Sequence, residues 1–305
     1  MWNIGANDTA NCIGTTVGCG LISFRQAIIL VAGFSVLGAV LQGDQVMKTI
    51  GKGIVRVDLD YLAVLVALIC SGLFVTLATF FRIPTSTSQA IVGGVLGIGW
   101  ALEAQIDYAK FITIAQSWLI CPLLMMALAY CAYKLLIMLL TRLQRNALLV
   151  QNAIGRMAIL AACYVAFSMG ANNAGNAVGP IANLNLLHPK LLLLIGGLAI
   201  GVGAITYGKK VSETVGKGIT PLDLPGALVA QLTSALGMHF FSLIGIPVST
   251  SSAIVGAVVG VGLVKGAAAI SKKTIIVILT GWVLTPLCAA GTAYFCYKGI
   301  RYLVP

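Results

Sequence analysis

Charged residues are scarce in this chain. Asp, Glu, Lys and Arg make up only 9% of the 305 residues, whereas they form about 25% of an ordinary soluble domain. The mean hydropathy is +1.00, and the apolar runs are about 18–32 residues long, which suits helices that cross a hydrocarbon core of about 30 Å. The composition therefore predicts an all-α integral membrane protein, and it leaves no soluble domain that could bind nucleic acid.

The chain also lacks the common signatures of metal centres and hydrolases. No C-x-x-C pair occurs among the eight cysteines, and His188 and His239 are far apart in the sequence. The H-E-x-x-H, G-x-S-x-G and Walker A motifs are absent. We therefore expect neither an enzyme nor a resident metal or cofactor, and we interpret the cysteines as small core residues.

Basic residues outnumber acidic ones, 19 to 8, and the net charge is +11. Most of the Lys and Arg residues stand between the apolar runs. Contact with the headgroups of a lipid bilayer explains this placement, and an electrostatic funnel for an anion is the alternative. Lys52 and Lys217 occupy matching Gly-Lys-Gly loops, where headgroup contact and a role in gating are both open interpretations.

The sequence consists of two similar halves. Residues 5–11 read Gly-Ala-Asn-Asp-Thr-Ala-Asn, and residues 170–176 read Gly-Ala-Asn-Asn-Ala-Gly-Asn. Residues 83–99 and 246–262 each place a proline before a Ser/Thr cluster and an apolar, glycine-spaced run, and most of their positions are identical. We therefore predict a first transmembrane repeat in residues 1–150 and a second in residues 151–305.

Each half is expected to contain the same order of elements: an Asn-rich break, an apolar helix, a Gly-Lys-Gly loop, a second helix, the Pro-Ser-Thr helix and a long closing helix. The helices are expected at about 21–42, 59–81, 84–101 and 109–141 in the first half, and at about 189–207, 224–244, 247–265 and 273–300 in the second. A further helix, over about 157–169, leads into the second break. Only residues 1–4 precede the first break, so a truncated start or a lost helix is expected.

The two Asn-rich breaks form the predicted cation site. Asp8 is the acidic residue placed most clearly beside such a break, and an ionisable group at membrane depth indicates function. Glycines would let the helix unwind there, so that backbone carbonyls and side-chain oxygens could surround Na⁺. Interhelical hydrogen bonding is the alternative role of these amides. The predicted cation ligands are Asn7, Asp8, Asn172 and Asn173.

The two Pro-Ser-Thr stretches form the predicted anion site. Proline and Ser/Thr residues start helices, and a helix start offers free N–H groups and a positive dipole end to an anion. The alternative is that the hydroxyls bond back to the preceding helical turn. The predicted anion ligands are Thr85, Ser86, Thr87, Ser88, Ser249, Thr250, Ser251 and Ser252, together with Asn11 and Asn176 of the breaks.

Taken together, these motifs resemble the inorganic phosphate transporter family, which includes microbial phosphate permeases, animal sodium–phosphate cotransporters and some sulfate permeases. The resemblance rests on both Asn-rich breaks, both Pro-Ser-Thr stretches and Gly-Lys-Gly-Ile, and it extends over nearly the whole chain. It implies an inverted-repeat secondary transporter with broken helices and re-entrant Pro-Ser-Thr hairpins, assembled as a homodimer. It also implies that the breaks and the hairpins surround the anion and its coupling cation.

The expected function is secondary import of inorganic phosphate across the cell membrane, coupled to Na⁺ or alternatively to H⁺, by alternating access. Sulfate uptake by the same fold is the alternative within the family, and a passive anion channel is the alternative outside it. The chain has no large hydrophilic central loop, which resembles compact prokaryotic members. Asn173 stands where many members have an aspartate, so one cation site is expected to be weaker or missing.

Overall fold

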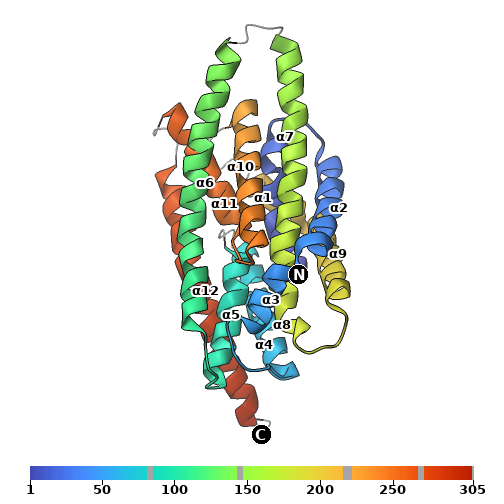
Figure 1. Ribbon diagram of the computed structural model, residues 1–305, viewed down its shortest axis with the longest axis vertical. Helices are drawn as coiled ribbons and strands as arrows, with labels where there is room; N and C mark the ends of the chain where they lie inside the picture. Colours follow the sequence, from blue (N-terminus) through green and yellow to red (C-terminus); the bar gives the residue numbers. More distant parts are fainter. Residues whose placement is uncertain (81–84, 143–146, 216–221, 267–270, 304–305) are drawn as a thin grey trace.

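The structure is a computed structural model that describes residues 1–80, 85–142, 147–215, 222–266 and 271–303 (Figure 1). Within these ranges the chain is helical throughout, apart from turns and one isolated antiparallel bridge between Val55 and Ile106. Seven of the described helices are long and apolar enough to cross a membrane. The chain is therefore a multi-pass, all-α membrane protein, as its composition predicts.

The helices follow the predicted order in both halves. The first half contains α1 (Trp2–Gly18), α2 (Phe24–Gln42), α3 (Asp44–Lys52), α4 (Tyr61–Phe80), α5 (Thr87–Ala101) and α6 (Tyr108–Arg142). The second half contains α7 (Ala147–Met169), the π-helix η1 (Gly170–Ala174), α8 (Gly175–Ala182), α9 (Pro189–Val215), α10 (Leu224–Leu243), α11 (Thr250–Lys265) and α12 (Lys272–Leu303).

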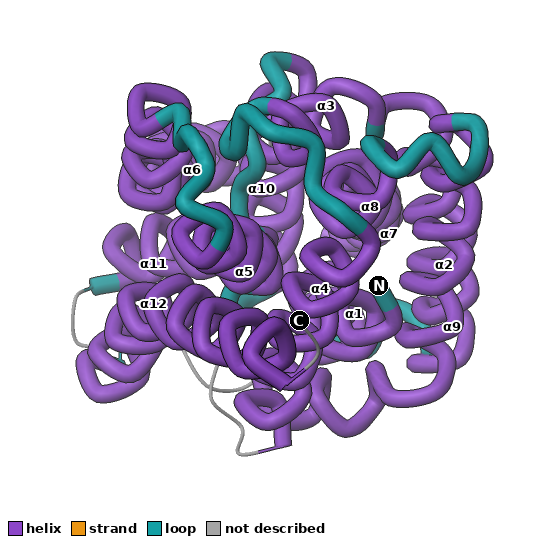
Figure 2. Tube along the Cα trace, turned by 90° about the horizontal axis from the view of Figure 1, so that it is seen from below, coloured by secondary structure: helices purple, strands orange, loops and turns teal. Residues whose placement is uncertain are grey.

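The helices form two groups, which Figure 2 shows side by side. One group packs α1 and α2 against α7 and α9, and the other packs α5 against α12 and α6 against α11. In both groups, these contacts join helices from different halves of the chain. α10 joins the two groups, because it contacts α7 as well as α6 and α11.

Glycines show how closely α5 and α11 approach their partners and in which direction they run. A Cβ atom at Gly93 or Gly97 of α5 would collide with the backbone of Pro286 or Ala290 of α12, so α5 and α12 are parallel. In the same way, a Cβ atom at Gly256 or Gly260 of α11 would collide with the backbone of Pro122 or Met126 of α6, so α11 and α6 are also parallel. Since Figure 1 shows α6 rising from the lower end and α12 descending to the C-terminus, α5 and α11 run in opposite directions.

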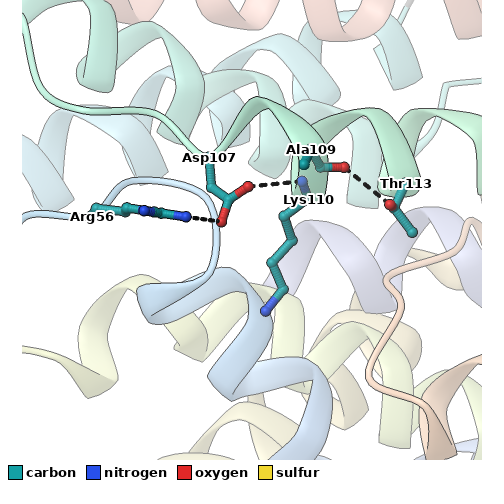
Figure 3. Close-up of polar contacts among 5 residues, drawn as sticks. All are labelled: Arg56, Asp107, Ala109, Lys110 and Thr113. Atoms are coloured by element: carbon teal, nitrogen blue, oxygen red, sulfur yellow. Dashed lines mark hydrogen bonds and ion pairs between the residues drawn. The ribbon is translucent and has the colours of Figure 1, made fainter.

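Figure 3 shows the polar contacts at the lower turn before α6. Arg56 Nη2 donates to Asp107 Oδ2 at 2.8 Å, and the N–H of Lys110 donates to Asp107 Oδ1 at 3.0 Å, so Asp107 also caps α6. The hydrogen bond from Arg56 and then that from the Lys110 N–H hold the pKa of Asp107 below its usual range. Together with the Val55–Ile106 bridge, these contacts attach the loop after α3 to the start of α6.

A cluster of Asp60, Arg301 and Tyr297, here called the lower clamp, holds the start of α4 against the end of α12. Asp60 Oδ1 accepts the N–H of Ala63 at 2.7 Å, and Asp60 Oδ2 accepts Arg301 Nη2 at 2.8 Å. Arg301 Nε also donates to the Tyr297 hydroxyl at 3.2 Å.

A matching cluster of Asp223, Lys265 and Tyr133, the upper clamp, holds the start of α10 against the end of α11 and against α6. Asp223 accepts Lys265 Nζ at 2.8 Å, the Tyr133 hydroxyl at 2.8 Å and the N–H of Gly226 at 3.1 Å. Burial opposes the ionisation of Asp223, but the hydrogen bonds from Lys265 and Tyr133 outweigh it and hold its pKa below the usual range. The lower clamp lies at the end of α12, which is parallel to α5, and the upper clamp lies at the end of α11. Because α5 and α11 run in opposite directions, the two clamps lie at opposite ends of the molecule.

The structure corrects two predictions about local structure. Residues 5–11 are not unwound, because α1 is continuous through them. The glycine there permits close packing instead: a Cβ atom on Gly5 would lie 1.8 Å from the carbonyl oxygen of Ile200 on α9. The predicted Gly-Lys-Gly loop is partly helical, because Gly51 and Lys52 end the strongly amphipathic helix α3 (Asp44–Lys52) and only Gly53 follows it as the C-cap. The second break is a single π-helical turn, η1, between α7 and α8.

Candidate functional site

The two Pro-Ser-Thr stretches meet the two Asn-rich segments in the middle of the molecule. Ser86 caps α5 and Ser249 caps α11, because their hydroxyl oxygens accept the N–H groups of Gln89 and Ser252. The predicted anion ligands of both stretches, residues 85–88 and 249–252, are all buried. Buried helix starts of this kind are placed to receive an anion in an apolar environment.

Asp8 and Asn173, which are equivalent in the two halves, face each other at the centre of this site. Asn173 Nδ2 donates to Asp8 Oδ2 at 2.9 Å. Each residue also bonds the equivalent threonine of its own half: Thr87 donates to Asp8 Oδ2 at 2.9 Å, and Asn173 donates to Thr250 at 3.0 Å. Asp8 Oδ1 has one long contact, to Asn11 Nδ2 at 3.4 Å, so that oxygen retains free acceptor capacity.

Asn11 and Asn176 each donate a hydrogen bond to a serine of the other half of the chain. Asn11 Nδ2 of the first half donates to Ser251 of the second at 3.0 Å. In the same way, Asn176 Nδ2 of the second half donates to Ser88 of the first at 2.8 Å. The structure thus brings together Asn-rich segments and hydroxyl clusters that lie far apart in the sequence.

Asn7 and Asn172 donate hydrogen bonds to neighbouring helices. Asn7 Nδ2 donates to Thr79 of α4 at 2.8 Å, and Asn172 Nδ2 donates to Ser242 of α10 at 3.0 Å. These hydrogen bonds tie α1 and η1 to the two helices that precede the Pro-Ser-Thr stretches. The interhelical role considered for these amides is therefore present in the structure for both residues.

Several buried oxygens at the site have no hydrogen-bond partner among the described residues. They are Thr85 Oγ1, Gln89 Oε1, Asn176 Oδ1 and Ser252 Oγ. Buried polar atoms normally have partners, so unpartnered ones at a polar centre indicate a place for a ligand. Hydroxyls can donate to an anion or accept from a donor, whereas amide oxygens can only accept.

Gln231 is a buried polar residue that the sequence motifs do not indicate. Its Nε2 atom donates to the carbonyl oxygen of Cys12 at 2.8 Å and to the Thr15 hydroxyl at 2.6 Å, which fixes α10 against α1. A lone glutamine within the apolar run of α10 is the signal that could have identified it.

The two gating candidates lie outside this cluster. Lys52 is exposed at the end of α3, and its Nζ atom lies 3.6 Å from Asp58 Oδ1. Lys217 lies outside the described residues. The contacts of Lys52 are those of a surface ion pair, so they do not connect it to the centre of the molecule.

The site combines the two chemistries that a cation and an oxyanion require. One carboxylate and several amide and hydroxyl oxygens can surround Na⁺, while hydroxyls and the N–H groups of two helix starts can donate to an anion. Among the described residues no group of three or more His, Cys, Asp or Glu side chains could hold a metal ion. The oxygens available are therefore neutral except for Asp8.

Known proteins resemble this chain over almost its full length. "Putative phosphate permease PF1020" of Pyrococcus furiosus is 28% identical and covers 99% of this chain and 94% of its own length. "Putative phosphate permease MJ0630" of Methanocaldococcus jannaschii is 30% identical, with 95% and 90% covered. A solved structure described as "The sodium-dependent phosphate transporter" superposes with a TM-score of 0.91 at 28% identity, covering 100% of this chain and 96% of that one.

The family comparison agrees with these relatives. The model of the phosphate transporter family matches residues 4–153 and again residues 141–293. The chain therefore belongs to the phosphate transporter family.

Proposed function

We propose that this protein carries inorganic phosphate across the membrane together with Na⁺. The observation that carries the proposal is the central site itself, where the single carboxylate of Asp8 lies beside two hydroxyl-rich helix starts. The names of the relatives and of the similar solved structure favour phosphate as the anion and Na⁺ as the cation.

The cation would bind at the free oxygen of Asp8. Asp8 Oδ2 already accepts from Thr87 and Asn173, whereas Oδ1 has only its long contact with Asn11. The predicted neighbours Asn7 and Asn173 would supply neutral oxygens around it. The third predicted neighbour, Asn172, would act by orienting the site, because its Oδ1 already accepts from the Val248 N–H and Asn176 Nδ2. A bound cation would also offset the charge of an incoming anion, which is a physical reason for coupled binding in a low dielectric.

The anion would bind between the starts of α5 and α11. The hydroxyls of Thr85 and Ser252 have no hydrogen-bond partner among the described residues, and Ser86 and Ser249 cap the two helix starts. Donors that are fixed by the fold replace the water around the anion and remain weak enough to release it.

The transport step would be alternating access between two inverted repeats, residues 1–150 and 151–305. The opposite directions of α5 and α11, and the contacts that recur in equivalent places, support this symmetry. In this scheme one group of helices moves against the other around the central site. We also propose, from the resemblance, a homodimer in a prokaryotic cell membrane, which sedimentation of the purified protein would test.

Uptake of radiolabelled phosphate into proteoliposomes tests the function. Wild-type protein is expected to import phosphate when Na⁺ is present outside, and removal of the Na⁺ gradient is expected to abolish accumulation. Sulfate uptake that phosphate does not inhibit would replace phosphate by sulfate as the substrate. Flux that persists without Na⁺ or a proton gradient, at rates above carrier turnover, would indicate a passive channel.

Asp8→Asn tests the cation site in the same assay. We expect a loss of Na⁺-dependent uptake of about tenfold or more, the factor that roughly 1.5 kcal/mol of lost ion binding gives. Asp44→Asn is the matched control: Asp44 lies at the start of α3, none of the hydrogen bonds described for the central cluster involves it, and its substitution should leave uptake near the wild-type rate. Equal uptake by wild type and Asp8→Asn would contradict the cation site.

A further inference from the structure

The orientation of the Asn172 amide is fixed by groups that can play only one role. Asn172 Oδ1 accepts the backbone N–H of Val248 at 3.1 Å, and Asn172 Nδ2 donates to the carbonyl oxygen of Ile246 at 3.2 Å. Its second Nδ2 partner, Ser242, donates its own hydrogen to the Met238 carbonyl at 2.8 Å and must therefore accept. Reversal of the amide would break each of these hydrogen bonds.

Asn172 in turn fixes the orientation of Asn176. Asn176 Nδ2 lies 3.2 Å from Asn172 Oδ1, an acceptor, and 2.8 Å from Ser88 Oγ. Ser88 donates its hydrogen to the Val248 carbonyl at 2.8 Å, so it too accepts from Asn176. Both Nδ2 hydrogens of Asn176 are thereby used within the protein.

The remaining atom, Asn176 Oδ1, is a buried acceptor without a donor. The residue is 0% exposed, and no described group donates to this oxygen. An amide oxygen cannot become a donor, so only a ligand that brings its own hydrogen, or a cation, can satisfy it. The equivalent oxygen of Asn11 is not among the buried atoms without a partner.

We infer that Asn176 Oδ1 accepts a hydrogen bond from an O–H group of the transported anion and thereby selects phosphate over sulfate. The inference rests on the proposed phosphate function and adds the basis of its selectivity. At neutral pH phosphate carries one or two O–H groups, whereas sulfate carries none. A sulfate ion would leave Asn176 Oδ1 unpaired and would place its own oxygen lone pairs toward it.

The unpartnered hydroxyls of the site suit the oxygens of the same anion that carry no hydrogen. Thr85 Oγ1 and Ser252 Oγ are hydroxyls, one in each Pro-Ser-Thr stretch, and each can donate to a phosphate oxygen. The amide oxygens of Asn176 and Gln89 are unpartnered acceptors, so the site combines donors with acceptors, which matches a protonated oxyanion. A set of donors alone would match sulfate equally well.

Anion binding to the purified full-length chain in the presence of Na⁺ tests the inference by calorimetry. Wild-type protein should bind phosphate and arsenate about 10- to 100-fold more tightly than sulfate and selenate, the range expected for a buried acceptor that is left unpaired. Asn176→Ala should reduce this preference to about threefold or less. An unchanged preference in Asn176→Ala would overturn the inference.

Asn11→Ala is the matched control. Asn11 makes the equivalent contact to a serine of the opposite half, but it has no unpartnered buried oxygen. Its loss should weaken phosphate and sulfate alike and leave their ratio close to the wild-type value. A loss of preference in Asn11→Ala equal to that in Asn176→Ala would also overturn the inference.

Monofluorophosphate tests the wild-type protein directly and needs no variant. At pH 8 it is a dianion, like most of the phosphate, and it has the same shape but lacks the O–H group. Phosphate should bind about tenfold more tightly or better. Equal binding of the two anions would overturn the inference.

If Asn176 Oδ1 binds a cation in place of an O–H group, the binding measurements should give a different result. In that case Asn176→Ala would raise the Na⁺ concentration needed for half-maximal binding and leave the preference among anions unchanged, which overturns the inference. Discrimination against monofluorophosphate without uptake into proteoliposomes would support the inference and reject the proposed function. Phosphate uptake without discrimination would reject the inference alone.

Discussion

The central site has a carboxylate at Asp8 and a neutral amide at the equivalent position, Asn173. The two residues occupy equivalent positions, and their side chains are 2.9 Å apart. Two carboxyl groups at this distance would have to share a proton or bind a cation between them. The amide of Asn173 supplies a hydrogen bond instead, so the site holds one carboxylate without needing either. This contact gives a physical reason for the expectation that one cation site of this chain is weaker or missing.

Asp107 provides a prediction about pH. Because the hydrogen bond from Arg56 lowers the pKa of Asp107 in the folded protein, the pair stabilises the fold when the carboxyl is ionised and loses its effect as the pH falls. Asp107→Asn should lower the melting temperature slightly above about pH 5, and the difference from wild type should shrink as the pH falls through the lowered pKa of Asp107. The asparagine can still cap α6, so the substitution isolates the ion pair.

Asp58→Asn is the control for this measurement of thermal stability. Asp58 pairs with Lys52 at 3.6 Å, and both side chains are largely exposed, so its loss should leave the melting temperature unchanged at every pH. An equal effect of the two substitutions, or an effect of Asp107→Asn that grows in acid, would contradict the assignment.

At the scale of elements, close contact between helices depends on glycine. A Cβ atom at Gly97 of α5 would lie 2.1 Å from the Ala290 carbonyl oxygen, and one at Gly260 of α11 would lie 2.2 Å from that of Met126. Since backbone atoms cannot move aside singly, Gly97→Ala and Gly260→Ala should each destabilise the protein by about 1–3 kcal/mol. A lower melting temperature of the purified variants would show this.

Gly33→Ala is the matched control in α2. A Cβ atom there would meet nothing within 4 Å, and alanine favours a helix over glycine. The melting temperature should therefore stay the same or rise. If all three substitutions had the same effect, helix propensity rather than close packing would determine the stability.

The sequence predicts elements better than it predicts how they meet. Hydrophobic runs and the Pro-Ser-Thr starts place α5 and α11 within a few residues, because capping is local chemistry. The glycine of residues 5–11 suggests unwinding, but it serves the approach of α1 to α9, which no local signal shows. The sequence does not predict the amphipathic helix α3, because the glycine and lysine at its end are typical of a loop.

The central residues could be named from the sequence, but their pairing could not. Duplication indicates that Asn11 and Asn176 are equivalent, and polarity in an apolar chain indicates that they matter. That each bonds a serine of the other half follows only from the packing of the halves. The orientation of the Asn176 amide depends on Ile246 and Val248, whose backbone roles the sequence does not reveal.

At the scale of the whole molecule, the upper and lower clamps lie where the proposed alternating access would require contacts that break in turn. Each clamp joins the residue that precedes α4 or α10 to a helix end, and the two clamps lie at opposite ends of the molecule. Cys19 is a natural reporter for the upper end, because it is half-buried and its Sγ atom lies 3.9 Å from the Leu222 carbonyl, next to Asp223. Burial and then the charge of Asp223 raise the pKa of the Cys19 thiol, which suppresses its reactivity.

Asp223→Asn should therefore open the upper end and expose Cys19. Asparagine keeps the helix cap but loses the charge that holds Lys265, so both access and thiolate content should increase. We expect modification of Cys19 by a water-soluble maleimide, followed by peptide mass spectrometry, to become several-fold faster. Asp60→Asn makes the same change at the lower end and should leave Cys19 at the wild-type rate or below it, because release of the lower clamp favours a closed upper end. Equal acceleration by both substitutions would mean that the clamps stabilise the fold generally and do not control which end is open.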